Sequence, residues 1–408
     1  MKKKVVAIFT GNRAEHGLLF PVIKAISLHP SLEYKLLVSG AHLDPNFGNT
    51  LNEIRNDGFE IYEEIKIEMI DKSFSVIPKA IGSGIISISN ALEKLKPDFV
   101  IVYGDRFESF AAAIAATQMN FPTAHIEGGD LTEGGALDDS VRHAITKLAH
   151  LHFTTNDEAS KRIAGLGEEV WRIHTVGFTA VDLIEQKNYA TPLEIQSQLN
   201  IDFKKPIVLF TQHSISQTPE ISEALVNPSL SAMRKLSEES VQIILTYPNN
   251  DKGSAEIISC IEQFKMSSNS NVIIAKSLGR YYYHGILALA LNQNNRIACV
   301  GNSSSGIKET PAFGCPTVNI GSRQEGRLRG NNIIDVNYDS DEIYKATLKC
   351  LHDGKFRKIA SEGVNPYWKG GAGEKIANLL ASISINQELI RKKMTLKHEK
   401  LEALDNVL

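Results

Sequence analysis

The residues with the clearest chemical potential are three consecutive serines, Ser303–Ser305, followed by Lys308. The apolar run 297–300 before them predicts a buried strand, and residues 307–313 after them are typical of a short helix. Where a strand leads into a helix, unpaired backbone N–H groups and the positive end of the helix dipole favour phosphate. The segment is not a Walker A motif, because its spacing differs and Glu309 stands where a magnesium-binding hydroxyl would be. Serine also caps helices, so this segment alone supports phosphate binding and simple capping about equally.

Carboxylates form a second group of candidates. Asp105 and Glu127 directly follow predicted strands, and Asp138 and Asp139 stand at the start of a predicted helix. Carboxylates gathered in one site raise one another's pKa and can exchange protons with a substrate. Taken singly, Asp105 and Asp138 could instead be helix caps. A magnesium site is a further alternative, but no known metal motif is matched, and we predict that the protein uses no metal. The acidic residues of that alternative site are Glu127, Asp130, Glu133, Asp138 and Asp139.

Histidines and arginines form a third group. His42, His125 and His213 lie at the ends of predicted strands, which favours an acid–base or phosphate-contacting role. Four arginines carry forked donors that suit a diphosphate. They are Arg13, Arg106, Arg323 and Arg327. No Gly-x-Gly-x-x-Gly follows the first strand and no Gly-x-Ser-x-Gly occurs, so a dinucleotide redox cofactor and a serine nucleophile elbow are disfavoured. We predict no cofactor.

Short apolar runs alternate with amphipathic segments along the chain, and this alternation predicts how the candidates are positioned. Strands buried on both faces and separated by helices indicate parallel sheets built from right-handed βαβ units. The first series of expected strands is 5–10, 34–39, 61–67, 98–103, 122–126, 152–155 and 173–176. The second series is 206–211, 241–246, 271–275, 297–300, 317–320 and 332–336. The first helix is expected over 18–28, which leaves 11–17 as a loop.

The two strand series predict an α/β protein with two doubly wound, Rossmann-like domains. Residues 1–180 form the first domain with the carboxylates, and residues 200–365 form the second with the phosphate-binding segment. Residues 366–408 are expected to be C-terminal helices that could cross back to the first domain. Ligands of open α/β sheets bind beyond the carboxyl ends of the strands, so we expect the active site in the cleft between the domains.

Composition narrows the class of protein. The 408 residues carry a formal net charge of -3, which gives no reason to expect nucleic acid or an anionic membrane as a partner. The four cysteines show no paired spacing, which is typical of a reduced, cytoplasmic protein. The apolar run after the N-terminal lysines is too short for a signal peptide, and no run is long enough for a membrane helix. We expect a soluble, cytoplasmic protein.

Taken as a set, the motifs resemble the UDP-N-acetylglucosamine 2-epimerases, in particular the hydrolysing branch that feeds sialic acid synthesis. The matching motifs occur in the family's order at 10–15, 48–50, 104–106, 125–129, 138–147, 301–306 and 321–327. Together they are far more specific than any one of them. The segment 130–135 is longer and richer in glycine than the family's usual spacing, so Asp139 is the alternative to Asp138.

The resemblance implies a glycosyltransferase-B-like fold and assigns roles to individual residues. The residues expected to contact the UDP-sugar are Arg13, His42, Arg106, Ser303, Ser304, Glu309 and Arg323. Glu309 is the one expected to bind the ribose hydroxyls. The residues expected in catalysis are Asp105, Glu127, Asp138 and His213. A homodimer or homotetramer is expected from the family.

The reaction that the resemblance implies is a hydrolysing epimerisation. A base removes the C2 hydrogen of UDP-N-acetylglucosamine while UDP leaves C1, and 2-acetamidoglucal forms. Water then adds at C1 and a proton at C2 from the opposite face, which gives N-acetylmannosamine. Arginines and a helix N-terminus stabilise the departing diphosphate, so no cofactor is required.

Three alternatives remain open. The first is a hydrolysing 2-epimerase acting on UDP-2,4-diacetamido-2,4,6-trideoxyglucose, as in legionaminic acid synthesis, because the motifs do not distinguish substituents at sugar C4 and C6. The second is a glycosyltransferase of the same fold, which would need an acceptor site but not the carboxylate set. The third is a catalytically silent UDP-sugar-binding regulator, against which the intact acid–base residues argue.

Overall fold

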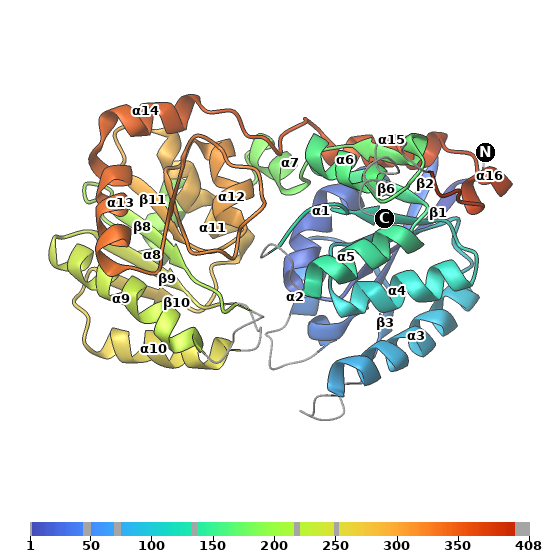
Figure 1. Cartoon of the computed structure of the whole chain (residues 1–408), viewed down its shortest axis with the longest axis horizontal. Helices are drawn as coiled ribbons and strands as arrows, with labels where there is room; N and C mark the ends of the chain where they lie inside the picture. The colour runs from blue at the N-terminus through green and yellow to red at the C-terminus, as the bar shows by residue number, and fades with distance from the viewer. Residues whose placement is uncertain are drawn as a thin grey trace, which may run out of the picture. The chain divides into compact units, whose positions relative to one another are not determined.

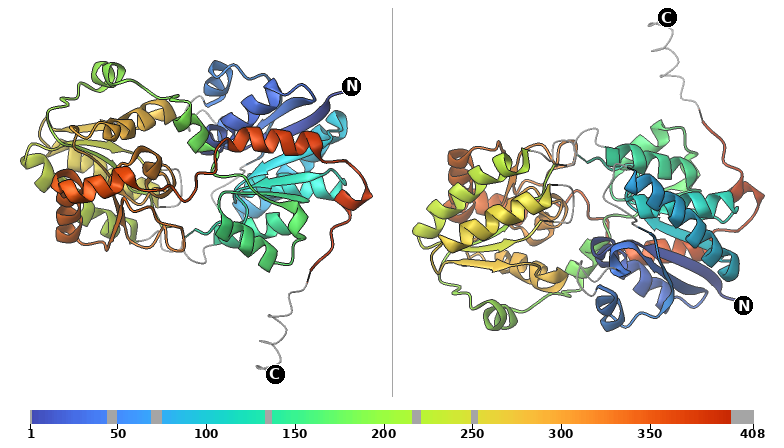
Figure 2. Two further views of the ribbon diagram at one scale, coloured as in Figure 1. Left: turned by 90° about the horizontal axis from the view of Figure 1, so that it is seen from above. Right: turned by 90° about the horizontal axis from the view of Figure 1, so that it is seen from below.

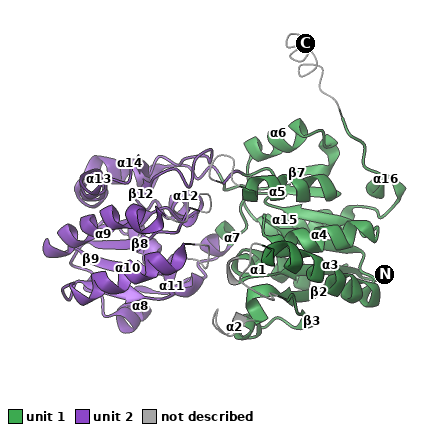
Figure 3. Cartoon of the chain, turned by 60° about the horizontal axis from the view of Figure 1, so that its bottom comes forward, with its two compact units in different colours: residues 1–130, 137–182, 367–408 green, residues 131–136, 183–366 purple. Residues whose placement is uncertain are grey.

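The computed structural model describes residues 2–43, 50–68, 75–132, 137–215, 221–248 and 253–395, with the backbone alone at residues 13, 14 and 50. The chain forms two compact units (Figure 3). Unit 1 comprises residues 1–130, 137–182 and 367–408, and unit 2 comprises residues 131–136 and 183–366. The chain therefore leaves unit 1 after residue 182 and returns to it at residue 367.

Unit 1 is built on a parallel sheet of seven strands in the order β3-β2-β1-β4-β5-β6-β7. The strands are β1 (Lys4–Thr10), β2 (Leu32–Ser39), β3 (Ile61–Ile65), β4 (Phe99–Tyr103), β5 (Thr123–Ile126), β6 (Leu151–Thr154) and β7 (Ile173–Thr175). The central strands β4, β5 and β6 are buried along their whole length, because helices cover both faces of the sheet (Figures 1 and 2).

The helices of unit 1 occupy the intervals between its strands, except for the last two along the chain, which follow β7. They are α1 (Arg13–Leu28), α2 (Thr50–Asn56), α3 (Val76–Leu95), α4 (Phe107–Gln118), α5 (Leu137–Leu148), α6 (Asp157–Gly165), α15 (Ala372–Ser382) and α16 (Gln387–Ile390). Short 3-10 helices occupy Gly40–Leu43 and Val170–Arg172. Helix α7 (Ala180–Glu185) spans the boundary between the units.

Unit 2 is built on a parallel sheet of six strands in the order β10-β9-β8-β11-β12-β13. The strands are β8 (Ile207–Thr211), β9 (Gln242–Thr246), β10 (Val272–Ala275), β11 (Ile297–Gly301), β12 (Thr317–Ile320) and β13 (Ile333–Val336). The helices are α8 (Pro192–Leu199), α9 (Ser222–Glu238), α10 (Ser254–Met266), α11 (Gly279–Ala288), α12 (Ser305–Lys308), α13 (Ser340–His352) and α14 (Gly354–Glu362). The prediction of two doubly wound α/β sheets is confirmed.

The start of the first helix differs from the prediction. Helix α1 begins at Arg13 instead of Leu18, so the expected loop over 11–17 is wrong. Asn12 caps this helix, since its side chain accepts a hydrogen bond from the backbone N–H of Glu15 at 3.1 Å. The Glu15 carboxylate in turn accepts from the backbone N–H of Gly11 at 2.8 Å. These two hydrogen bonds stabilise the start of the helix. The polar residues that were predicted to be a loop therefore form the first turn of α1.

Helix α15 belongs to unit 1 although it follows unit 2 in the chain, and it lies beside α1 (Figure 2). The two helices approach closely at Gly373, where an added Cβ would lie 2.5 Å from the carbonyl oxygen of Pro21. Asp182 receives hydrogen bonds from the backbone N–H groups of Ala372 and Gly373 at 2.9 and 2.7 Å. Its carboxylate therefore satisfies the free donors at the start of α15.

No helix in the described ranges combines the length and the apolar character needed to cross a membrane. All four cysteines are free and buried.

Candidate active site

A buried guanidinium, that of Arg142 on α5, organises the carboxylates of unit 1. Its Nη2 atom donates to Asp105, which follows β4, and its Nη1 atom donates to the backbone carbonyl of Glu127, which follows β5, at 3.0 Å. The Glu127 carboxylate lies 3.9 Å from Nη1. Burial alone would lower the pKa of Arg142, but the nearby carboxylates raise it above its ordinary value. The guanidinium therefore stays charged and brings Asp105 and Glu127 together.

Glu127 is held in an unusual backbone conformation. Its φ angle is +65°, in the left-handed region that L residues seldom adopt, and this costs about 1–3 kcal/mol. Its carboxylate accepts a hydrogen bond from the hydroxyl of Tyr103, the last residue of β4. Burial, together with the Glu127 carboxylate, raises the pKa of Tyr103 well above its usual range, so this phenol remains a donor. The surrounding bonds thus hold a carboxylate in a strained position, a condition that is common in active sites.

The remaining predicted carboxylate lies on the same helix as Arg142. Asp138 is half-buried in the first turn of α5, whereas Asp139 is buried and 4 % exposed. Asp139 is among the carboxylates that raise the pKa of Arg142. The capping alternative for Asp105 is wrong, because the cap position of α4 is Arg106 and Asp105 bonds to Arg142 instead.

The two predicted histidines of unit 1, His42 and His125, are neutral and make internal contacts. Burial lowers the pKa of His42 to about 3, and its Nε2 atom lies 3.0 Å from the Thr10 hydroxyl. Burial also lowers the pKa of His125 to about 3. His125 bonds through Nε2 to the carbonyl of Gly104 at 2.7 Å and through Nδ1 to Thr146 at 3.1 Å. The prediction of an acid–base or phosphate-contacting role for His125 is therefore wrong, since Nε2 is engaged by the carbonyl next to Asp105 and Nδ1 by Thr146 on α5.

In unit 2, the segment after β11 presents backbone donors. Gly301 ends the strand with a φ of +138°, and an added Cβ would lie only 1.8 Å from the carbonyl oxygen of Thr211. Among the described residues, the backbone N–H groups of Ser303 and Ser304 have no hydrogen-bond acceptor, and Ser304 is exposed. Instead of one helix over 307–313, α12 begins at Ser305 and a 3-10 helix follows over Thr310–Phe313. Two free donors next to a helix start suit an anion.

Asn302 joins the ends of three strands in unit 2. Its side chain exchanges two hydrogen bonds with the backbone of His213, which follows β8, at 2.7 and 2.9 Å. Its carbonyl accepts from Gln324 at 2.8 Å and from Arg323 at 3.3 Å, both of which follow β12. Burial and the Arg323 charge lower the pKa of His213 well below its usual value. Asn302 thus places a neutral histidine and an arginine beside the Ser303–Ser305 segment.

Glu309 lies just past α12 and is fixed by two donors. Its Oε2 atom lies 2.6 Å from Nε2 of His284 on α11 and 3.0 Å from the hydroxyl of Ser305. Burial alone would raise the pKa of Glu309, but the contacts with His284 and Ser305, together with the charge of Lys308, lower it. The carboxylate is therefore ionised at neutral pH.

The two other predicted arginines differ from each other. Arg106 is exposed at the start of α4, and its Nε atom lies 3.4 Å from the carboxylate of Glu108. Arg327 uses its fork within unit 2, donating to the carbonyl of Leu131 at 2.7 Å, to Gln324 at 2.6 Å and to Thr132 at 3.0 Å. Those contacts leave Arg327 as a poor candidate for the diphosphate.

Several predicted residues lie outside what the structure describes. They are the side chain of Arg13, the motif residues Gly48 and Asn49, and Glu133 of the alternative metal site. Within the described ranges, no group of three or more His, Cys, Asp or Glu side chains could hold a metal ion.

Three residues of the candidate site were not predicted from the sequence: Arg142, Tyr103 and His284. For Arg142 a signal was present, because an arginine three and four residues after Asp139 and Asp138 shares their helix face. Tyr103 and His284 contact Glu127 and Glu309, respectively, from positions distant in the sequence, so only the folded structure shows these contacts.

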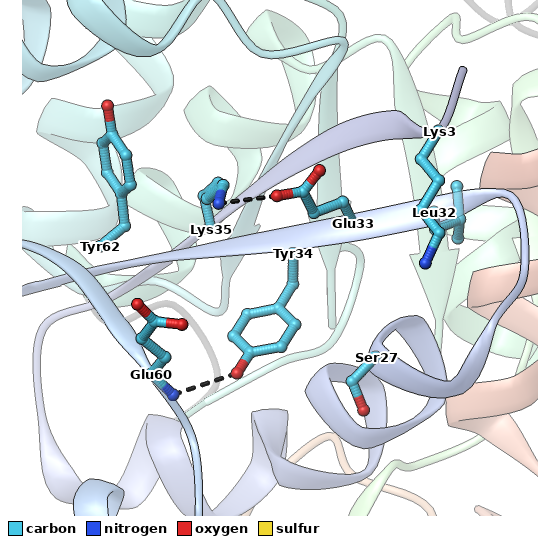
Figure 4. Close-up of a pocket in the computed structure, with 8 residues that line it drawn as sticks. All are labelled: Lys3, Ser27, Leu32, Glu33, Tyr34, Lys35, Glu60 and Tyr62. Atoms are coloured by element: carbon cyan, nitrogen blue, oxygen red, sulfur yellow. Dashed lines mark hydrogen bonds and ion pairs between the residues drawn. The ribbon is translucent and has the colours of Figure 1, made fainter.

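A pocket of about 180 Å³ lies at the other end of the unit 1 sheet, near the first residues of β2 and β3 (Figure 4). Its polar groups pair with one another: Lys35 lies 2.7 Å from Glu33, and the Tyr34 hydroxyl accepts from the backbone N–H of Glu60 at 3.0 Å. None of the predicted site residues lines it. The pocket is therefore separate from the candidate active site.

Comparisons with known proteins agree with the resemblance. A family model described as UDP-N-acetylglucosamine 2-epimerase matches residues 24–381. The chain is 33% identical over 392 residues to the UDP-N,N′-diacetylbacillosamine 2-epimerase (hydrolyzing) of Legionella pneumophila, covering 96% of this chain and 99% of that protein. It is 30% identical over 357 residues to the UDP-N-acetylglucosamine 2-epimerase of Neisseria meningitidis, covering 87% and 89%.

Among solved structures, the UDP-GlcNAc 2-epimerase from Neisseria meningitidis bound to UDP-GlcNAc superposes with a TM-score of 0.79. The match covers 93% of this chain and 100% of that chain at 18% identity. The likeness confirms the predicted glycosyltransferase-B-like fold.

Proposed function

This chain belongs to the UDP-N-acetylglucosamine 2-epimerase family, and we propose that it is a hydrolysing 2-epimerase that converts a UDP-linked 2-acetamido sugar and water into the free 2-epimer and UDP. The enzyme is a UDP-sugar 2-epimerase; the hydrolytic outcome, the sugar and the roles of individual residues are the proposal.

The observation that carries the proposal is the Arg142 cluster. Asp105 and Glu127 come from successive strand ends and share one buried guanidinium, and the half-buried Asp138 lies one helical turn from it. Removing a weakly acidic C2 proton and later returning one to the other face needs more than one proton-transfer group. Asp105, Glu127 and Asp138 lie in different environments, so one of them can accept the C2 proton and another can donate a proton to the opposite face.

In the proposed elimination, a carboxylate takes the proton from C2 while the C1–O bond breaks. The electron pair of the C–H bond forms the C1–C2 double bond, and UDP leaves with the bridging oxygen. Negative charge builds on the diphosphate at that moment, and Arg323 with the N–H groups of Ser303 and Ser304 suits that charge. Glu309 binds the ribose hydroxyls in this proposal.

In the proposed hydration, water adds to C1 of the glycal and gives up a proton to a carboxylate, while a second acid delivers a proton to C2 from the opposite face. Asp105, Glu127, Asp138 and His213 are the groups that we assign to these proton transfers. Both candidate sugars carry the same atoms at C1 and C2, so the same residues serve either one. The scheme needs neither a metal nor a redox cofactor.

Two sugars fit the family. UDP-N-acetylglucosamine is the substrate expected from the sequence, and the Neisseria meningitidis relative named for it is 30% identical. UDP-N,N′-diacetylbacillosamine is the second candidate, favoured by a 33% identical relative that the chain covers almost completely. They differ at C4 and C6, away from the reacting atoms.

The test offers the purified protein each UDP-sugar separately and identifies the products by NMR. We expect free 2-epimerised sugar and UDP in a one-to-one ratio from at least one of them, and the ratio of kcat/KM between the two names the substrate. A UDP-linked 2-epimer without free sugar would contradict the hydrolysing assignment. Release of the unepimerised sugar would contradict the elimination.

A further inference from the structure

His284 is a buried residue of unit 2 that no part of the proposed mechanism yet uses. It lies on α11, is 2 % exposed, and packs against Phe313 with ring centroids 5.7 Å apart. Its Nε2 atom lies 2.6 Å from Oε2 of Glu309, which is 25 residues further along the chain. Its Nδ1 atom has no hydrogen-bond partner in the part of the chain that the structure describes. Since Nε2 is the ring nitrogen that faces the carboxylate, the Nε2–H group donates the hydrogen bond to Glu309.

The contact uses only one oxygen of Glu309. Both His284 and Ser305 donate to Oε2, while Oε1 has no partner among the described residues. An ionised carboxylate with one oxygen anchored and the other unoccupied is a directed acceptor of hydrogen bonds. Glu309 follows the Ser303–Ser305 segment by one helical turn, so this acceptor lies close in sequence to the donors assigned to the diphosphate.

We propose that His284 is a positioning residue that sets the orientation of Glu309, so that the free oxygen accepts from the ribose hydroxyls of a nucleoside diphosphate. The inference rests on the proposed function, which assigns UDP to unit 2. Because the Nε2–H group of His284 and the hydroxyl of Ser305 both donate to Oε2, the other oxygen, Oε1, is left as the acceptor. The ring cannot turn away without losing its packing on Phe313, so the carboxylate is held before the nucleotide arrives.

Replacing His284 should affect nucleotide affinity differently, depending on whether the residue only supports the fold or positions Glu309. If the histidine only supports the fold, its replacement should weaken all nucleotides alike. If it acts through Glu309, the loss should be confined to nucleotides that carry ribose hydroxyls, because only they use the free oxygen.

The experiment measures binding of UDP and of 2′,3′-dideoxy-UDP by calorimetry in the full-length protein. We expect the wild type to bind UDP about 10- to 100-fold more tightly than the dideoxy nucleotide, the range for hydrogen bonds to a charged group. In His284→Leu we expect that preference to fall below about threefold, with the affinity for the dideoxy nucleotide nearly unchanged. His284→Gln keeps an N–H donor and should retain most of the preference. Tyr281→Phe, which alters an exposed hydroxyl on the same helix beside Glu194, is the matched control and should behave as wild type.

An unchanged preference for UDP in His284→Leu overturns the inference, whatever happens to the absolute affinity. A wild type that binds both nucleotides equally also overturns it, while leaving the epimerase reaction intact. A wild type that binds no UDP contradicts the proposed function itself. If His284→Leu does not fold, the ¹⁵N NMR signal of the imidazole in the wild type decides: it should shift with UDP and not with the dideoxy nucleotide, and equal shifts count against the inference.

Discussion

The two units gather charge in contrasting ways. Unit 1 buries both signs together, with Asp105 and Glu127 drawn to the guanidinium of Arg142. Unit 2 presents the backbone N–H groups of Ser303 and Ser304 beside Arg323, and the nearby carboxylate of Glu309 accepts hydrogen bonds from His284 and Ser305. A crowded set of carboxylates suits proton transfer, whereas open donors suit a diphosphate. The comparison teaches that substitutions in unit 1 should mainly affect turnover and substitutions in unit 2 mainly affinity.

The sharpest test of this division is Glu127→Gln, which keeps the shape of the side chain and removes its charge. We expect kcat to fall about 10²- to 10⁴-fold, the usual effect of losing a general acid or base. UDP affinity, measured by calorimetry, should stay within about twofold of wild type, because UDP is assigned to unit 2. A large loss of UDP affinity with little loss of kcat would contradict the assignment of proton transfer to unit 1 and of UDP binding to unit 2.

The next test separates two neighbouring carboxylates on α5. Asp138→Asn should lower kcat about 10²-fold with little change in stability, because the half-buried Asp138 is the one assigned to proton transfer. Asp139→Asn should cost about 1–3 kcal/mol of unfolding free energy, because Asp139 is buried beside Arg142. Steady-state kinetics and urea denaturation check both. The reverse pattern would move the catalytic role to Asp139, the alternative that the sequence left open.

The fold was more predictable from the sequence than the contacts within the candidate site. Both sheets were predictable, because strands buried on both faces appear as apolar runs. The Arg142 cluster was not, because its contact with Asp105 joins residues 37 apart and depends on how β4 and α5 pack. The bond between His284 and Glu309 is equally non-local. The early start of α1 was missed for a local reason, since Asn12 caps a turn that composition alone reads as loop.

On the unit 2 side, Arg323→Ala should weaken UDP binding about 10- to 100-fold, because a charge-assisted contact to the diphosphate is lost. Ser303→Ala should weaken it less, by about threefold to tenfold, because the variant loses only a neutral hydroxyl and keeps the backbone N–H group. Arg296→Ala is the matched control, since Arg296 stands at the other end of β11 and donates to the carbonyl of Lys204. Calorimetry that shows equal UDP affinity in Arg323→Ala and Arg296→Ala would remove the phosphate assignment.

The last effect on the unit 1 side concerns stability instead of activity and involves Glu15. Burial, followed by the Glu108 charge, raises the pKa of Glu15 from its ordinary value near 4.5 to about 8. Between these two values the folded protein keeps a proton that the unfolded chain releases, so stability falls as pH rises. The loss is on the order of a few kcal/mol across that window.

Glu15→Gln should flatten this decline, because glutamine can still accept from the backbone N–H of Gly11 but does not ionise. Unfolding free energies of the wild type and the variant at pH 5 and pH 8 provide the measurement. The exposed Glu93→Gln on α3 is the control and should leave the slope unchanged. Identical slopes in wild type and Glu15→Gln would show that Glu15 is ionised in the folded protein.

The most direct test of the central claim follows the isotopes through the reaction. With the substrate turned over in heavy water, we predict that the released sugar carries deuterium at C2, because the carboxylates exchange that proton with solvent between elimination and hydration. In water enriched with ¹⁸O, the new anomeric oxygen should come from solvent while UDP keeps the original bridging oxygen, since elimination breaks the C1–O bond. NMR at C2 and mass spectrometry of both products read these outcomes together. Protium retained at C2 of the epimerised sugar would contradict the elimination and hydration proposed for Asp105, Glu127 and Asp138.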